Sequence, residues 1–188
     1  MTGAELERRC CAFTGHRPGR YPFGEDITHP DAVRLRERLH REIIALYRQG
    51  VDCFYSGMAQ GADQWAAEQV LSLRDECGLP LRLICALPCR GQDRGWPKRA
   101  REHYLGLLLR ADEVIYLAER YTEGCMQQRN RYMVDRAETL LAVYDGGEDG
   151  GTAHTVRYAM RRRRRIISIH PDSLLVTRGD PQCRLELP

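Results

Sequence analysis

The chain has 188 residues, of which 43% are hydrophobic and 29% are charged. This length suits one domain with a buried core, and the balance of apolar and charged residues excludes wholesale disorder. No apolar run approaches the roughly 18 residues of a membrane-spanning helix, and residues 1–9 lack the apolar stretch of a secretory signal. The composition therefore predicts a globular cytoplasmic protein with no membrane partner.

The net charge is only +3, but the basic residues are unevenly distributed. Lys98 is the only lysine, and five arginines are adjacent at Arg161–Arg165. Such a block is typical of a solvated helix end or of a nucleic-acid-binding patch. The eight cysteines include no Cys-x-x-Cys pair. Without a secretory signal they indicate neither a disulfide framework nor a metal site.

The first half of the chain alternates short apolar runs with helical periodicities. A buried strand at 9–14 is followed by a turn-rich loop at 15–30, which is long enough to be functional. Asp31 is expected to cap a helix that ends at Gly50. A strand at 51–55 and a helix at 61–77 come next, and a strand at 81–87 completes this half.

The second half repeats the same alternation. A polar stretch leads into a helix that ends near Ala111, and a strand at 113–118 follows. The remaining predicted elements are a helix at 124–136, a strand at 139–144, a helix at 152–162 and a strand at 166–169. Residues 172–188 form a weakly patterned tail.

Six apolar strands alternating with helices indicate an α/β protein with a single Rossmann-like, doubly wound and mainly parallel sheet, covered by helices on both faces. Right-handed crossovers favour the strand order 3-2-1-4-5-6. In that order, a ligand is expected beyond the carboxyl ends of strands one and four, with help from the loops after strands two and five.

Three loops carry residues suited to an anionic ligand. Thr14–Pro18 offers a tight turn, a hydroxyl and a guanidinium after strand one. Ser56–Asp63 places glycines on both sides of a helix start, where backbone N–H groups bind anions. Asp145–Thr152 is a second glycine-rich entry to a helix. Neither a Walker A loop nor a strict dinucleotide fingerprint is present, and nothing in the sequence implies a cofactor.

Four segments together resemble the YpsA-like branch of the SLOG superfamily: Thr14–Pro18, Ser56–Asp63, Gln128–Asp135 and Ala142–Thr152. The resemblance covers about residues 9–171. It implies one SLOG-like domain, a small nucleotide-derived ligand and a homodimer. The residues expected at the ligand are Thr14, Gly15, His16, Arg17, Ser56, Gly57, Met58, Gly61, Asp63, Arg129, Asn130, Asp145, Gly146, Gly150, Gly151 and Thr152.

The resemblance also bears on catalysis. Met126–Asn130 resembles the Met-x-x-Arg-Lys motif of the LOG phosphoribohydrolases, which places Arg129 at their catalytic arginine. Their catalytic glutamate corresponds to Thr155, and a hydroxyl cannot replace a carboxylate as a proton donor or charge partner. The carboxylates that remain near this loop are Asp63, Asp145, Glu148 and Asp149.

Three hypotheses follow. The first is a binding protein for a nucleoside phosphate or an ADP-ribose-like molecule, acting as a sensor. The second is a hydrolase of the N-glycosidic bond of nucleoside monophosphates, with Arg129 as candidate catalytic group. The third is a nucleic-acid-binding protein that uses Arg161–Arg165, since the segment Gln128–Arg131 also resembles part of the DNA-processing protein A family.

Overall fold

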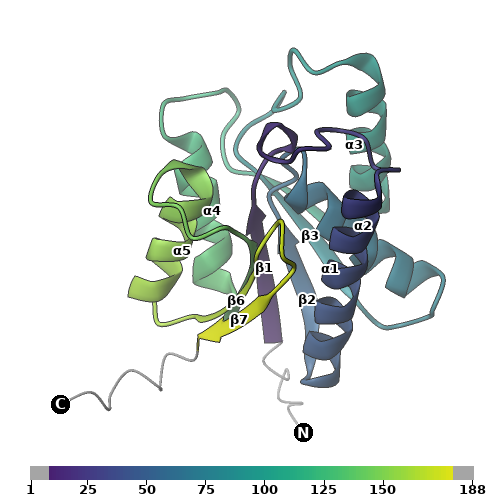
Figure 1. Ribbon diagram of the computed structural model, residues 1–188. Coiled ribbons are helices and arrows are strands. Elements are labelled where there is room, and N and C mark those ends of the chain that lie inside the picture. Colours follow the sequence, from purple (N-terminus) through teal and green to yellow (C-terminus); the bar gives the residue numbers. More distant parts are fainter. Residues whose placement is uncertain (1–8, 180–188) are drawn as a thin grey trace, which may run out of the picture.

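Alternating strands and helices build one seven-stranded sheet in the computed structural model of the protein, which describes residues 9–179 (Figure 1). The strands are β1 (Arg9–Gly15), β2 (Val51–Ser56), β3 (Arg82–Leu87), β4 (Glu113–Tyr116), β5 (Thr139–Val143), β6 (Arg165–Ile169) and β7 (Val176–Gly179). The α-helices are α1 (Pro30–Arg48), α2 (Ala62–Asp75), α3 (Lys98–Arg110), α4 (Cys125–Arg136) and α5 (Gly150–Arg161).

The strand order is β4-β3-β2-β1-β5-β6-β7, and every neighbouring pair is parallel except β6 and β7. This arrangement confirms the Rossmann-like α/β class. The expected order 3-2-1-4-5-6 is wrong, because β4 lies outside β3 at the sheet edge and β5 takes the place beside β1. The strand order therefore reverses between β1 and β5, and the loops that meet at this point follow β1 and β5, not strand four.

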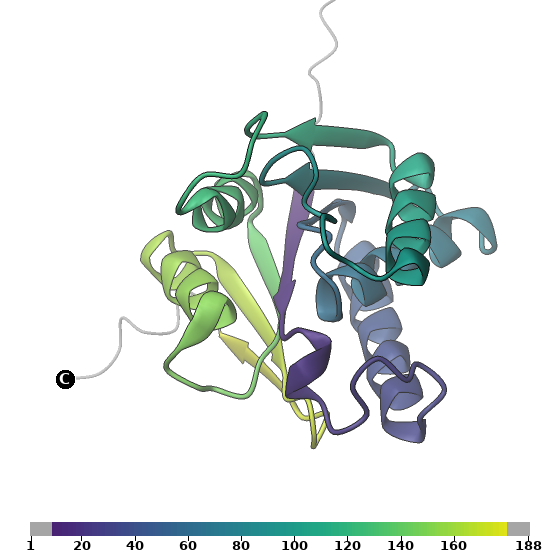
Figure 2. The same ribbon diagram turned by 90° about the horizontal axis from the view of Figure 1, so that it is seen from above.

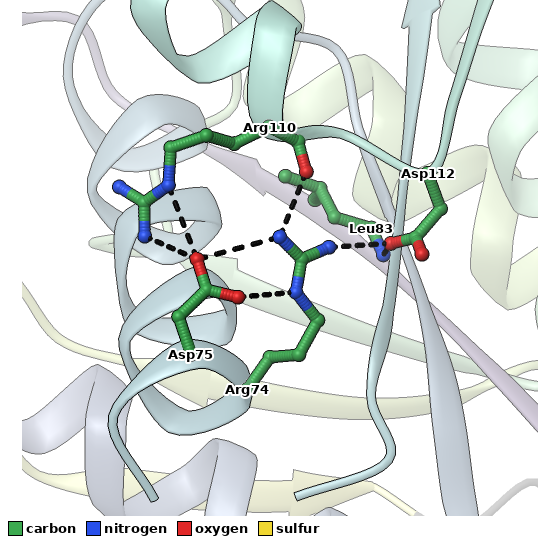
Figure 3. A network of polar contacts seen from close by, with 5 residues as sticks. All are labelled: Arg74, Asp75, Leu83, Arg110 and Asp112. Atoms are coloured by element: carbon green, nitrogen blue, oxygen red, sulfur yellow. Dashed lines mark hydrogen bonds and ion pairs between the residues drawn. The ribbon is translucent and has the colours of Figure 1, made fainter. Parts of the chain in front are cut away.

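A polar network explains why β4 adds to β3 (Figure 3). The Asp112 N–H donates to the Leu83 carbonyl at 2.9 Å, and the Leu83 N–H donates to the Asp112 carboxylate at 2.8 Å. Arg74 of α2 donates to the same carboxylate at 2.8 Å and to the Arg110 carbonyl at 2.9 Å. The start of β4 is thus tied to β3 by side chains that hydrophobic periodicity does not reveal.

Helices cover the sheet on both faces. Helices α1, α2 and α3 lie on one side, and α4 and α5 on the other (Figures 1 and 2). In β1, Cys11 and Phe13 face the first layer, and Cys10 and Ala12 face the second. Because both faces of the central strands are buried, these strands appear in the sequence as continuous apolar runs.

The loop between β1 and α1 packs on α2. Tyr21 and Phe23 are buried, and their rings lie 5.1 and 5.9 Å from the ring of Trp65. Helix α1 begins at Pro30, one residue before the expected cap, and the ring of His29 accepts the Asp31 N–H. The prediction that Asp31 caps this helix is therefore wrong, since a proline at the first helical position moves the cap to His29.

The sequence analysis missed β7. This four-residue strand pairs antiparallel with β6, with Thr177 opposite Ser168, inside the segment interpreted as a tail. The rest of that segment, residues 180–188, lies outside the described residues. Among residues 9–179, no helix combines the length and hydrophobicity that a membrane crossing requires.

Candidate functional site

A buried ion pair lies at the carboxyl ends of the central strands. Arg129 of α4 and Asp63 of α2 are 4% and 5% exposed, and Arg129 Nη1 is 3.6 Å from Asp63 Oδ2. The guanidinium packs against Gly57, where an added Cβ would lie only 1.3 Å from Nη1. Gly57 is therefore needed as packing space for Arg129, a role that the glycine pattern alone does not distinguish from ligand contact.

The electrostatics of this pair are set by burial. Desolvation raises the pKa of Asp63, although the Arg129 cation and the Ala59 N–H oppose the shift. Desolvation also lowers the pKa of Arg129, which Asp63 opposes. An arginine remains protonated in proteins. Among the described residues, Nε and Nη1 of Arg129 have no hydrogen-bond acceptor, so the cation keeps unused donors.

The loop after β1 is attached to the start of α2. A Cβ at Gly15 would lie 2.4 Å from the Ala62 Cβ, and a Cβ at Gly61 would lie 2.6 Å from the His16 carbonyl oxygen. The same carbonyl accepts the Ala62 N–H at 3.2 Å. These glycines permit the close approach of β1 and α2 that brings His16 to the site, while Arg17 is exposed.

His16 contacts Asp145 where the loops that follow β1 and β5 lie side by side. Its Nε2 is 3.2 Å from Asp145 Oδ1, and Arg20 donates to the other carboxylate oxygen. Burial opposes ionisation of Asp145, but the Gly147 N–H, Arg20 and His16 outweigh it and lower the pKa of Asp145 to about 2. Asp145 is therefore a firmly ionised anchor of this loop.

Ser56 and Met58 use their polar groups within the protein. The Ser56 hydroxyl donates to the Asp63 carbonyl at 2.9 Å and accepts the Met58 N–H at 3.1 Å. Met58 is buried with a φ of 57°, and its carbonyl accepts bonds from the side chains of Gln64 and Gln92. The two glutamines were missed by the sequence analysis, because Gln92 comes from a distant loop without any local signal.

The first turn of α5 lies at the end of the glycine-rich loop after β5. Its N-cap residue, Asp149, makes no side-chain cap, and the turn contains no acidic residue. Gly146, Gly150 and Gly151 are exposed, whereas Thr152 is buried. The Asp149 side chain therefore leaves the first backbone N–H groups of α5 without a capping bond, although its carboxylate stands at the N-cap position.

Thr155 holds α5 to α4. Its hydroxyl accepts from the Asn130 amide and donates to the Gly151 carbonyl, both at 2.8 Å. These contacts lie in a groove of about 360 Å³ between the two helices, lined by Gln127, Asn130, Arg131, His154, Thr155, Arg157, Tyr158 and Arg161. Where the LOG motif has a glutamate, this chain has a hydroxyl that joins two helices.

The candidate carboxylates have different environments. Asp63 adjoins Arg129, and Asp145 adjoins His16 and Arg20. Glu148 and Asp149 are exposed. Within residues 9–179, no group of three or more His, Cys, Asp or Glu side chains is arranged to hold a metal ion. Only Asp63 thus combines burial with direct proximity to Arg129.

The arginine block lies at the end of α5 and the start of β6, at the edge opposite this site. Arg162 donates to Asp135 at 2.8 Å, and Arg164 donates to the Val134 and Asp135 carbonyls. Arg165 donates to the Gln49 side chain at 2.5 Å. These three arginines anchor neighbouring elements, whereas Arg161 extends into the α4–α5 groove.

An open, mainly parallel sheet whose order reverses beside glycine-rich strand-to-helix turns defines a Rossmann-like α/β protein. The family profile described as the YspA SLOG family, YpsA, matches residues 11–174. The chain therefore belongs to the YpsA family.

A relative and two solved structures resemble this chain. The chain is 28% identical over 153 residues to a UPF0398 protein of Bacillus cereus, with 80% of this chain and 82% of that protein covered. The fold resembles DNA processing protein A from Streptococcus pneumoniae, with a TM-score of 0.59 and 17% identity; the match covers 88% of this chain but only 51% of that one.

DNA processing protein A from Helicobacter pylori, whose structure describes a single-stranded DNA binding mode, gives a TM-score of 0.56 at 20% identity. The match covers 94% of this chain and 71% of that one. At these identities the two solved structures support the fold and leave the ligand to be argued from the site.

Proposed function

We propose that this protein binds a nucleotide-derived ligand, a nucleoside phosphate or an ADP-ribose-like molecule, at the carboxyl ends of β1, β2 and β5. The observation that carries this proposal is the buried Arg129 cation with its two unsatisfied nitrogens. Buried donors without acceptors are unfavourable. An oxygen-rich anion that reached this arginine would accept hydrogen bonds from both nitrogens. Binding of such an anion would therefore stabilise the folded protein.

The surroundings suit the parts of such a ligand. The uncapped first turn of α5, at Gly150–Thr152, would hold phosphate oxygens together with Arg129. The ribose or base would lie beside the buried segment that contains Ser56, Gly57 and Gly61. The remaining members of the site, Thr14–Arg17 and Asp145–Gly146, close it from β1 and β5. A protein that binds without turnover would act as a sensor.

Thermal shift with AMP, GMP, CMP, UMP and ADP-ribose tests this proposal. A ligand at 100 times its Kd stabilises by about 2.7 kcal/mol, which raises the Tm of a chain of this size by roughly 5–10 °C. Arg129→Gln should abolish the shift. Arg120→Gln, at an exposed loop position, should leave it intact. A folded wild-type protein that no member of the panel stabilises would contradict the proposal.

A second candidate is hydrolysis of an N-glycosidic bond, favoured by the 3.6 Å approach of Asp63 to Arg129. As the carboxylate of that pair, Asp63 would take a proton from the water that attacks the sugar carbon and pass it to the leaving base, so that the carboxylate is regenerated. Chromatography of free base released from nucleoside monophosphates measures this activity. Asp63→Asn should remove it, and a wild-type protein that binds nucleotides but releases no base would limit the function to binding.

A third candidate is single-stranded nucleic acid in the α4–α5 groove. The guanidinium carbons of Arg131 and Arg161 lie 5.6 and 5.7 Å from the Tyr158 ring centroid. Among the described residues, neither these arginines nor Arg157 has a carboxylate partner. A cationic groove around an aromatic ring suits phosphates and stacked bases.

Salt titration of oligonucleotide binding tests this third candidate. The logarithm of the binding constant should fall with that of the salt concentration by about 0.7 for each contacted single-strand phosphate. Replacing Arg131, Arg157 and Arg161 by glutamine should remove the binding. A matched triple variant at the exposed positions Arg34, Arg48 and Arg99 controls for lost charge. Equal losses in both variants would exclude a specific groove.

We further propose that residues 1–188 form one SLOG-like domain that works in the cytoplasm as a homodimer, as the family resemblance implies. Light scattering of the full chain measures the assembly. A monomer at micromolar concentration would contradict it.

A further inference from the structure

A second groove lies on the opposite side of α5 from the cationic one, over β6 and β7. Its volume is about 580 Å³. Its apolar walls are formed by Val156, Met160, Ile166 and Leu175. Small residues, Ser168, Thr177 and Gly179, line it along the two strands. The hollow therefore arises where α5 packs on β5 and β6, and where the two outer strands carry short side chains.

Large apolar side chains remain exposed around this groove. Leu175 is 70% exposed and Met160 is 48% exposed, whereas Val156 and Ile166 are buried beneath them. The volume falls within the roughly 300–1,000 Å³ of small-molecule sites, which are typically apolar with a few polar groups. Its dimensions and lining are those of a site for an organic molecule with an apolar body.

The charges in the groove are polarised. Arg163 and Arg164 immediately precede β6, and Asp145 follows the neighbouring parallel strand β5, at the opposite end of the groove. Arg164 is engaged with carbonyls of α4, and Arg178, which also lines the groove, pairs with Glu42 at 2.5 Å. Among the described residues, Arg163 makes no side-chain hydrogen bond or ion pair, and it is exposed. One unengaged cation thus marks one end.

The backbone at Arg163 supports a role for its side chain. Arg163 has a φ of 54°, directly after the C-cap of α5. Its N–H donates to the Met160 carbonyl, and the Arg164 N–H donates to the Ala159 carbonyl. This is the Schellman position, which favours glycine. Arg163 therefore adopts a left-handed conformation that glycine would adopt with less strain.

We propose that this groove binds an amphipathic organic anion of the medium-chain fatty acid class. Its hydrocarbon body would lie along Val156, Met160, Ile166 and Leu175, with its carboxylate at Arg163. The opposite polarity is disfavoured, because a carboxylate near Asp145 would meet a like charge. This groove shares Asp145 with the nucleotide site proposed above, but Arg163 at its other end belongs to the groove alone, so the Arg163 variants test this proposal independently.

Calorimetric titration of the full chain with three probes of equal length, decanoate, decanol and decylamine, tests the proposal. Decanoate should bind, and decanol and decylamine should each bind at least tenfold more weakly. Arg163→Gly should weaken decanoate at least tenfold without lowering the Tm, because glycine suits the backbone there; a folding defect is thereby excluded. Arg163→Lys should retain most of the wild-type affinity for decanoate. Thr177→Leu should block binding of all three probes by filling the groove. Arg99→Gln serves as a charge-matched control on α3.

Several results would overturn the proposal. No decanoate binding, equal affinity for decanoate and decanol, or an Arg163→Gly variant that binds like the wild type would each do so. If Met160→Glu and Leu175→Glu convert a dimer into monomers, the groove is an interface with a second copy. If decanoate binds only to a chain ending at Gly179, residues 180–188 are the natural occupant instead.

Discussion

Replacing Gly57 by alanine should disrupt the site without changing any charge. An alanine Cβ would lie 1.3 Å from Arg129 Nη1 and 2.1 Å from the guanidinium carbon, whereas ordinary contact begins at 3.4 Å. The guanidinium must therefore move by about 2 Å. Its separation from Asp63 is 3.6 Å, so a displacement of this size breaks the pair. The backbone itself is not strained, because Gly57 does not adopt a positive φ.

The expected loss of stability follows from burial. Separating a buried ion pair typically costs about 3–5 kcal/mol, because one charge is left uncompensated. For a chain of this size, that lowers the Tm by roughly 6–20 °C. The loss should also depend on pH. Without Arg129 beside it, the folded-state pKa of Asp63 rises further above its unfolded value. The free energy of unfolding of the variant therefore falls as pH rises through that folded-state pKa, and the variant is least stable toward neutral pH.

Thermal and urea unfolding between pH 5 and 8 measure both effects. Gly106→Ala in α3 is the matched control, because nothing lies within 4 Å of its added Cβ. Alanine in a helix interior should stabilise by about 1 kcal/mol there. Nucleotide-induced shifts should disappear in Gly57→Ala and persist in Gly106→Ala. A Gly57→Ala protein with wild-type Tm, flat pH dependence and intact binding would refute the assigned role of Arg129.

Three further predictions concern neighbouring residues. Arg163→Gly should raise stability by about 1 kcal/mol in urea unfolding, since it relieves a left-handed arginine; destabilisation would contradict this. Thr155→Val should cost about 1–3 kcal/mol in the same assay by removing the hydroxyl between Asn130 and Gly151, and an unchanged midpoint would argue against the link. The low pKa of Asp145, about 2, gives roughly 2 kcal/mol of stability above pH ~4 that is lost as pH falls toward 2. Asp145→Asn should therefore flatten the acid limb of a stability–pH curve, and an unaltered limb would exclude this contribution.

Local patterns were sufficient to predict the class of fold. The central strands are buried on both faces, so their apolar runs are visible in the sequence, as in Phe13 and its neighbours. Strand order was not predictable in the same way. The position of β4 depends on bonds between Asp112, Leu83 and Arg74, and β7 is too short and too exposed to produce a hydrophobic signal.

The site was predicted in part. Glycine-rich turns revealed where the loops converge, and the structure brings Arg129 and Asp63 together there. The roles of the individual glycines in these turns could not be predicted from the sequence. Gly57 and Gly15 are required by close packing against Arg129 and Ala62. A glycine in the sequence does not show which neighbouring side chain occupies the space beside it. Contacts such as that of Gln92 with Met58 join distant segments and have no local sequence pattern.

Helix α5 connects the proposals, because it separates two grooves of opposite character. Arg157 and Arg161 face the cationic groove beside α4, whereas Val156 and Met160 face the apolar groove over β6. The first turn of the same helix borders the nucleotide site. A ligand that shifts α5 at one groove must therefore change the shape of the other. Decanoate binding should alter the response to nucleotides by the same factor that nucleotides alter decanoate binding, since coupling between two sites is reciprocal. Affinities that are independent at the two sites would contradict this coupling through α5.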